Sequence, residues 1–221
     1  MLLQETKTSI CNKALSLVGE QPINSVEDNT TLPARICSQH YDLAMQTILE
    51  GGKWPFATVQ EPVERIFTSK PDKEQKYVYK IPNNCVLVID LKKRFDRKVL
   101  PNKLDWDIRF DKELGYPVIV CNGKSKTSSE IEEDIYQDDQ ILIEYVCDTG
   151  KAGTYPAMFV RCVVAQLAAD ICMGITHDVQ KFTSFTQYAA QLKEQALMNT
   201  LNEDGQEKVI WMDPFTASRG W

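Results

Sequence analysis

Residues 14–57, ALSLVGEQPINSVEDNTTLPARICSQHYDLAMQTILEGGKWPFA, contain two helical patterns joined by a turn and followed by an aromatic loop. The first helix is expected over residues 5–18, because apolar side chains recur from Ile10 at i, i+4, i+7 and i+8 and draw one stripe. Gly19 suits the end of this helix, and Pro22 prevents its continuation. This part of the chain therefore predicts one amphipathic helix and a sharp exit.

The second helix lies in the same stretch. Thr30 or Thr31 is expected to cap its start, and the pair Gly51-Gly52 to end it. Trp54 and Phe56 then form an aromatic pair on the loop that follows. They are expected either to lock this loop onto the core, which we prefer, or to contact another subunit.

From residue 77 the hydrophobic period changes to two, which is typical of β-strands. Asn122-Gly123 is a strong turn signal, and a further turn is expected at residues 82–84. The predicted strands are residues 77–81, 86–91, 99–100, 108–110, 117–121 and 141–147. The block from Tyr77 to Cys147 is therefore interpreted as a small antiparallel subdomain inserted between helices.

Two more helical patterns follow this block. Pro156 is expected at the first position of the third helix, which is apolar on most sides and should lie in the centre of the core. Asp178 is expected to cap the fourth helix, and Gly205 to mark its end. The predicted class is α+β: a four-helix core (1–60 and 150–205), an inserted β subdomain (61–149) and an extended C-terminal arm (206–221).

Composition excludes some classes of partner. The 221 residues are 43% hydrophobic and 25% charged, with a formal net charge of −6. This charge argues against a surface that grips DNA, because such binding depends on Lys and Arg, although DNA could pass an acidic wall. The most apolar stretch carries Arg161, Gln166 and Asp170, so it is a poor membrane span. The N-terminus has no signal-peptide pattern, and seven cysteines without a CxxC pair indicate unpaired thiols.

Catalytic and metal-binding patterns are weak. The two histidines, His40 and His177, have no nucleophile motif beside them and are expected to be structural. We expect no enzyme activity, no metal and no cofactor. The sequence also contains a run of acids, Glu130, Glu132, Glu133 and Asp134. The general interpretation is a solvated hairpin, and the more specific one is the wall of a channel past which DNA slides.

A basic run covers residues 92–94, with Arg97 and Lys98 beside it. A solvated hairpin tip is the preferred interpretation, because the interleaved aromatics of a strand-binding surface are missing. Contact with nucleic acid, or with an acidic patch on a neighbouring subunit, is the alternative.

The last sixteen residues show no sustained periodicity but carry Trp211, Phe215 and Trp221. Such aromatic side chains are typical anchors at protein interfaces. We expect this arm to dock on another chain, with folding back on its own subunit as the alternative.

Several of these segments, in this order, resemble the tail tubular protein A family of short-tailed bacteriophages. The N-terminal segments that carry the resemblance are Ala14-Leu15, Gly19, Pro22-Ile23, Ser25, Asp28, Ala34, Cys37, Tyr41, Trp54, Phe56 and Ala57. The later segments are Tyr77 to Cys85, Tyr155 to Phe159, Leu167 to Ala169 and Ile175-Thr176. The chain departs from the family in its longer tail and in an elaborated β insert.

The resemblance implies a head-to-tail adaptor: a homo-oligomeric ring of twelve copies between the portal protein and the tail nozzle, with a central channel. DNA would pass through this channel without sequence-specific binding, and no membrane would be involved. The protein would be made in the host cytoplasm and reside in the virion at the portal–tail junction. Separately from the resemblance, we expect the tail from about Val209 to Trp221, with Trp211, Phe215 and Trp221, to dock on the portal. Two alternatives remain: a tail-associated glycan or cell-wall hydrolase that uses acids such as Glu132 and Asp134, and a host-encoded interaction module.

Overall fold

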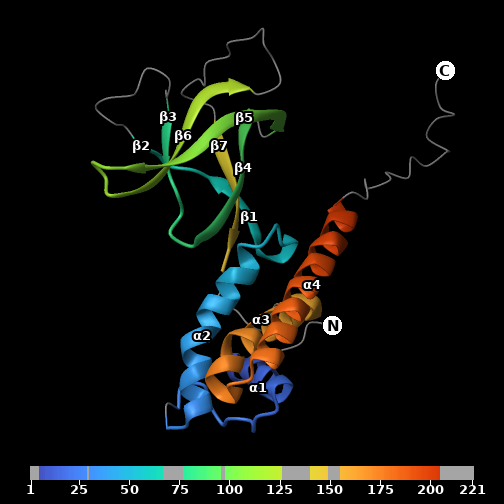
Figure 1. Cartoon of the computed structure of the whole chain (residues 1–221). Helices are drawn as coiled ribbons and strands as arrows, with labels where there is room; N and C mark the ends of the chain where they lie inside the picture. The colour runs from blue at the N-terminus through green and yellow to red at the C-terminus, as the bar shows by residue number, and fades with distance from the viewer. Residues whose placement is uncertain are drawn as a thin grey trace, which may run out of the picture.

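The computed structural model describes residues 5–28, 30–66, 77–95, 98–125, 140–148 and 155–204. Within these ranges the chain forms four α-helices and two small antiparallel sheets, which confirms a mixed α+β protein. The helices gather at one end of an elongated molecule and the strands at the other (Figure 1). The helices are α1 (Lys7–Val18), α2 (Leu32–Leu49), α3 (Ala157–Thr176) and α4 (Val179–Asp204).

Side-chain caps fix where the first two helices begin. The Thr6 hydroxyl accepts a hydrogen bond from the Ser9 amide at 3.1 Å and caps α1. Of the two threonines considered for α2, Thr31 is the cap, and its hydroxyl accepts from the Ala34 amide at 3.4 Å. These bonds satisfy amide groups that have no partner inside the first turn of a helix. The second helix therefore begins where the sequence predicted.

Gly19 ends α1 in the left-handed conformation, with φ of 87°. A Cβ at this position would meet no atom within 4 Å, so backbone strain alone sets the cost of a side chain. We expect Gly19→Ala to lower the free energy of unfolding by about 1 kcal/mol. Urea unfolding checks this value, with the exposed Ser16→Ala as control. A variant as stable as the parent would contradict the assignment of Gly19 as an obligatory helix end.

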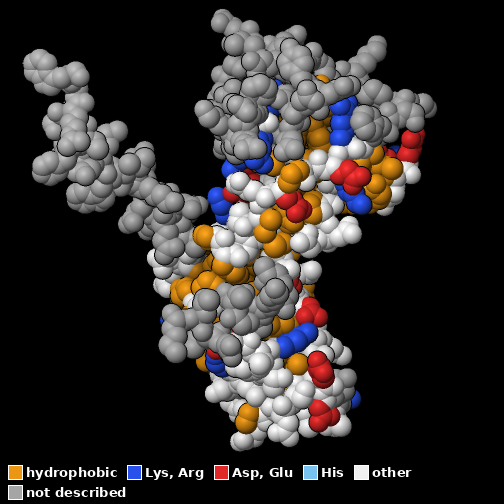
Figure 2. Space-filling model, turned by 180° about the vertical axis from the view of Figure 1, so that it is seen from behind, with side chains coloured by type: hydrophobic (Ala, Val, Ile, Leu, Met, Phe, Trp, Pro, Cys, Tyr) orange, Lys and Arg blue, Asp and Glu red, His pale blue; other side chains and the backbone are white. Residues whose placement is uncertain are grey.

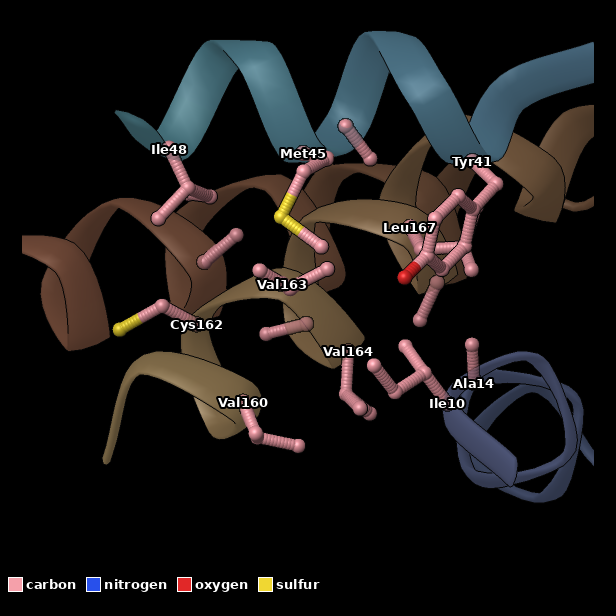
Figure 3. Packing of buried hydrophobic residues seen from close by; sticks show 14 of the residues in the cluster. Ile10, Ala14, Tyr41, Met45, Ile48, Val160, Cys162, Val163, Val164 and Leu167 are labelled. Atoms are coloured by element: carbon pink, nitrogen blue, oxygen red, sulfur yellow. The ribbon is translucent and has the colours of Figure 1, made fainter. Parts of the chain in front are cut away.

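Helix α3 is the centre of the helical end, and α1, α2 and α4 all pack on it. Ile48, Met45 and Tyr41 point from α2 toward α3, and Ile10 and Ala14 approach from α1 (Figure 3). Eleven α3 residues are buried, among them all of 162–165 and 167–169. This agrees with the prediction of a central helix with little polar surface.

The strands form a ladder that closes on itself. They are β1 (Thr58–Pro62), β2 (Arg65–Ile66), β3 (Tyr77–Lys80), β4 (Cys85–Phe95), β5 (Lys98–Asp111), β6 (Tyr116–Ser125) and β7 (Gln140–Cys147), in the order β1-β7-β4-β5-β6-β3-β2. The segment 58–66 pairs first with β7 and then with β3. Strand β5 likewise pairs first with β4 and then with β6. The segment 58–66 and strand β5 are therefore the corners at which one sheet passes into the other.

Closing the ladder creates a second hydrophobic core inside the strands. Its buried members are Tyr77, Tyr79, Leu91, Leu104, Ile119, Cys121, Ile141, Ile143, Tyr145 and Cys147. Strand β7 belongs to both cores, because alternate side chains of a strand point to opposite faces. Ile143 faces the strand core, whereas Val146 belongs to the helical core. This strand therefore joins the two ends of the molecule.

Two predictions about the strands were wrong. Asn122-Gly123 does not form a turn but lies within β6, where three residues (122–124) stand against one on β5. The extra residues form a bulge, for which glycine is well suited. The hairpin turn is instead at Lys112 to Gly115, where Gly115 has φ of 77°. Strand pairing also begins at Thr58, well before residue 77.

Candidate assembly surfaces

Four aromatic rings from two distant segments meet at the junction of helices and strands. Trp54 and Phe56 follow α2, whereas Tyr155 and Phe159 open α3. The ring centroids of Trp54 and Phe159 are 5.0 Å apart, and those of Phe56 and Phe159 are 4.8 Å apart. Both contacts are edge-to-face, which is the favoured geometry for aromatic pairs.

Hydrogen bonds hold Trp54 in this cluster. Its indole Nε1 donates to the Ile48 carbonyl at 2.8 Å, and its own carbonyl accepts from the Thr58 hydroxyl at 2.7 Å. Trp54 is 2% exposed and packs inside its own subunit, while Phe56 is half-buried. The cluster therefore links the two points at which the chain leaves the helices and returns to them.

A buried carboxylate lies close to this junction. Glu144 on β7 is 4% exposed, and its carboxylate accepts hydrogen bonds from Lys53, at 3.0 Å, and from Lys92 on β4. Burial alone would raise the pKa of Glu144, but the hydrogen bonds and charges of the two lysines outweigh burial and lower the pKa. This triad connects the end of α2 to two strands.

The triad lines one side of a cleft of about 750 Å³. The cleft opens where β5 leaves β4: these strands pair from Lys92 to Phe95, and β5 then pairs with β6. Across it, the Trp106 indole donates to Asp90 at 3.4 Å. The polar groups of this cleft are thus largely engaged with one another.

Stability is expected to depend on the charge of Glu144. The pKa of Glu144 in the folded chain lies below its ordinary value of 4.5. The charged carboxylate therefore stabilises the folded chain fully above pH 4.5, and this stabilisation is lost as the pH falls through the folded pKa. Glu144→Gln should lower the free energy of unfolding by about 1–3 kcal/mol at pH 7, and by less at pH 3.

Denaturant unfolding at a series of pH values checks this expectation, with the exposed Glu113→Gln as control. A difference between the parent and Glu144→Gln that stays constant from pH 7 to pH 3 would contradict the charged triad.

A second hollow, also of about 750 Å³, crosses the helical end. Its floor is the face of α3 between α1 and α4. The residues that line this α1–α3–α4 groove are Ser9, Asn12, Lys13, Ser16, Leu17, Ala157, Val160, Arg161, Val164 and Tyr188. Val160 and Val164 are buried beneath it, whereas Leu17 and Tyr188 are 43% and 38% exposed. The groove thus has an apolar floor and partly apolar walls.

Hydrophobic side chains also reach the surface elsewhere. Seen from behind, they gather around the waist between the helical and the strand ends (Figure 2). At the far end of the β5–β6 hairpin, Ile108 and Phe110 are 43% and 65% exposed. These exposed apolar groups suit contacts with other chains better than chemistry on a small molecule.

The basic run lies mostly within strands rather than at a hairpin tip. Lys92 is bound to Glu144, Lys93 is buried, and Arg94 is half-buried within β4. Lys98 begins β5, and Arg97 lies outside the described residues. The interpretation of residues 92–94 as a solvated hairpin tip was therefore wrong, because β4 is flanked there by β5 and β7.

Two predicted sets fall outside the described residues. These are the acids Glu130, Glu132, Glu133 and Asp134 and the aromatics Trp211, Phe215 and Trp221. The interpretations of the acids as a channel wall or as hydrolase residues, and of the aromatics as portal anchors, therefore remain predictions. Conversely, Lys53 and Glu144 were not predicted as site residues from the sequence. A signal for Glu144 was available, since it is the one charged residue in the apolar strand ILIEYVC.

The remaining polar candidates have structural positions. His40 is half-buried on α2, and His177 ends α3 in the left-handed conformation, with φ of 53°. The Asp178 carboxylate accepts from the amides of Gln180 and Lys181 and so caps α4, as predicted. None of the seven cysteines forms a disulfide, and six of them are buried. In the described ranges, no group of three or more His, Cys, Asp or Glu is placed to hold a metal ion.

Among the described residues, α3 is the helix that is long and apolar enough to cross a membrane by composition. Of its apolar window, 61% is buried inside the protein. Comparison of the sequence with protein-family models and with curated proteins returns no match.

Proposed function

We propose that the chain is a head-to-tail adaptor of a short-tailed bacteriophage. It would form a homo-oligomeric ring, of twelve copies by resemblance to the tail tubular protein A family, between the portal protein and the tail nozzle. A four-helix core with an inserted β subdomain would build the ring wall, and an extended C-terminal arm would dock on the portal. The protein would act without an active site or a cofactor.

The observation that carries the proposal is the aromatic cluster at the junction. Trp54 and Phe56 belong to one of the segments that resemble the family, and Tyr155 and Phe159 to another, about a hundred residues later. In the structure the four rings are in contact. Two of the segments that carry the resemblance thus build one aromatic cluster, which supports their interpretation as parts of a family pattern rather than as separate chance matches.

Shape and charge also support an assembly role. The molecule is elongated, with a helical end and a strand end (Figure 1), so that each end can meet a different partner. A net charge of −6 suits a channel wall that DNA slides past, because an acidic wall repels the phosphate backbone. We place Glu130, Glu132, Glu133 and Asp134 on that wall.

Loss of the gene product tests the proposal and separates it from the alternatives. Without an adaptor, infected cells should accumulate heads that package DNA but carry no tail, as seen by electron microscopy. Immunogold labelling of parent virions should mark the portal–tail junction. Complete tailed particles that fail to penetrate cells would indicate the hydrolase instead, and absence of the protein from purified virions would indicate a host module.

A further inference from the structure

We infer that the α1–α3–α4 groove receives the outer face of α2 from the next copy in the ring. This inference rests on the proposed ring and identifies the surfaces that close it. The outer face of α2, called here the α2 ridge, consists of exposed residues at spacings of three and four: Gln39, Asp42, Leu43, Gln46 and Glu50.

The groove and the ridge lie on opposite sides of the helical end. Both α1 and α4 pack on α3 and leave the face of α3 between them open as the groove. Val160, in the floor of this groove, lies on the side of α3 away from α2 (Figure 3). The α2 ridge faces outward on the other side, since its five residues are exposed and the buried face of α2 packs on α3.

Opposite placement is the geometry that a ring requires. A ring forms when one surface of a subunit binds a different surface of its neighbour and the rotation closes. A convex helix face on one side and a groove on the other supply such a pair. A self-complementary patch would instead give a closed dimer.

The charges of the two surfaces are complementary. Arg161 is exposed at the groove, and it makes no ion pair with the part of the chain that the structure describes. Lys13, the other cation of the groove, is bound to Glu5 but remains 45% exposed. On the ridge, Asp42 is bound to Lys7 of its own subunit at 2.8 Å, whereas Glu50 has no ion pair among the described residues. In the ring, Glu50 lies beside Arg161 of the next copy.

The apolar parts match as well. Leu43 is 58% exposed in the middle of the ridge. In the isolated subunit its apolar side chain is in contact with water, which is unfavourable. The groove offers Val160 and Val164 as its floor and Leu17 and Tyr188 as partly exposed walls. Leu43 is therefore the central anchor, and the Arg161–Glu50 pair lies at the rim and fixes the register.

The test uses the full chain mixed with purified portal rings, and native mass spectrometry counts the copies bound per ring. Leu43→Asp should lower that count and raise the concentration needed for half-saturation at least about tenfold. Val179→Asp is the matched control, because Val179 is 64% exposed and lies outside both surfaces. Circular dichroism checks that each variant is folded.

A charge exchange tests the pairing itself. Arg161→Glu and Glu50→Lys should each weaken assembly, and the chain that carries both changes should assemble as the parent does. Unchanged copy number for Leu43→Asp, or no rescue in the double variant, overturns the inference while leaving the adaptor proposal standing. If the parent chain binds no portal ring, the proposed function fails, and the interface fails with it.

Discussion

Replacing Trp54 with alanine is expected to lower the free energy of unfolding by about 3–5 kcal/mol. Trp54 is 2% exposed, and its ring touches Phe56 and Phe159. The change leaves a cavity at the junction and removes the donor to the Ile48 carbonyl. Because small domains are stable by only about 5–15 kcal/mol, this single change should leave a marginal protein.

Urea unfolding measures this loss, followed by both far-UV circular dichroism and tryptophan fluorescence. Phe110→Ala is the matched control, since Phe110 is 65% exposed on the β5–β6 hairpin and should change stability by less than about 0.5 kcal/mol. A loss below about 1 kcal/mol for Trp54→Ala would show that the aromatic cluster does not hold the junction together.

Truncation after Gly205 is expected to leave a folded chain that no longer binds portal rings. Neither hydrophobic cluster of the described chain includes a residue beyond Leu197, so the cores remain intact. The removed arm carries Trp211, Phe215 and Trp221, and anchors of this kind typically supply most of the affinity at an interface. We expect affinity for the portal to fall at least about a hundredfold.

Sedimentation of portal rings with the full and the truncated chain gives the two affinities, and thermal unfolding confirms that the fold is kept. A full-length variant with alanine at the three aromatic positions controls for the length of the arm. Undiminished portal binding by the truncated chain would remove the arm from the docking site.

The helices were the predictable part of this fold. Caps such as Thr31 and Asp178 and the stop at Gly19 act within one or two turns, so short stretches of sequence encode them. The strands were harder to predict, because their limits depend on partners far along the chain. Asn122-Gly123 carries a turn signal, yet in the structure it pairs along β5 and forms a bulge instead of a turn.

The candidate surfaces were less predictable still. The α1–α3–α4 groove exists because α1 and α4 leave one face of α3 open, and no local pattern gives that arrangement. The Glu144 triad also draws on three separate segments, although a lone acid in an apolar strand was a usable sign. Local sequence thus predicts the helices, whereas the limits of the strands and the surfaces arise from packing.

The most direct test of the adaptor proposal is the mass of the complex that the full chain forms with purified portal rings. We expect a discrete complex in which one ring of the chain, twelve copies by family resemblance, is added to each portal ring. A mass equal to that of the portal alone, at chain concentrations well above those in an infected cell, would contradict it.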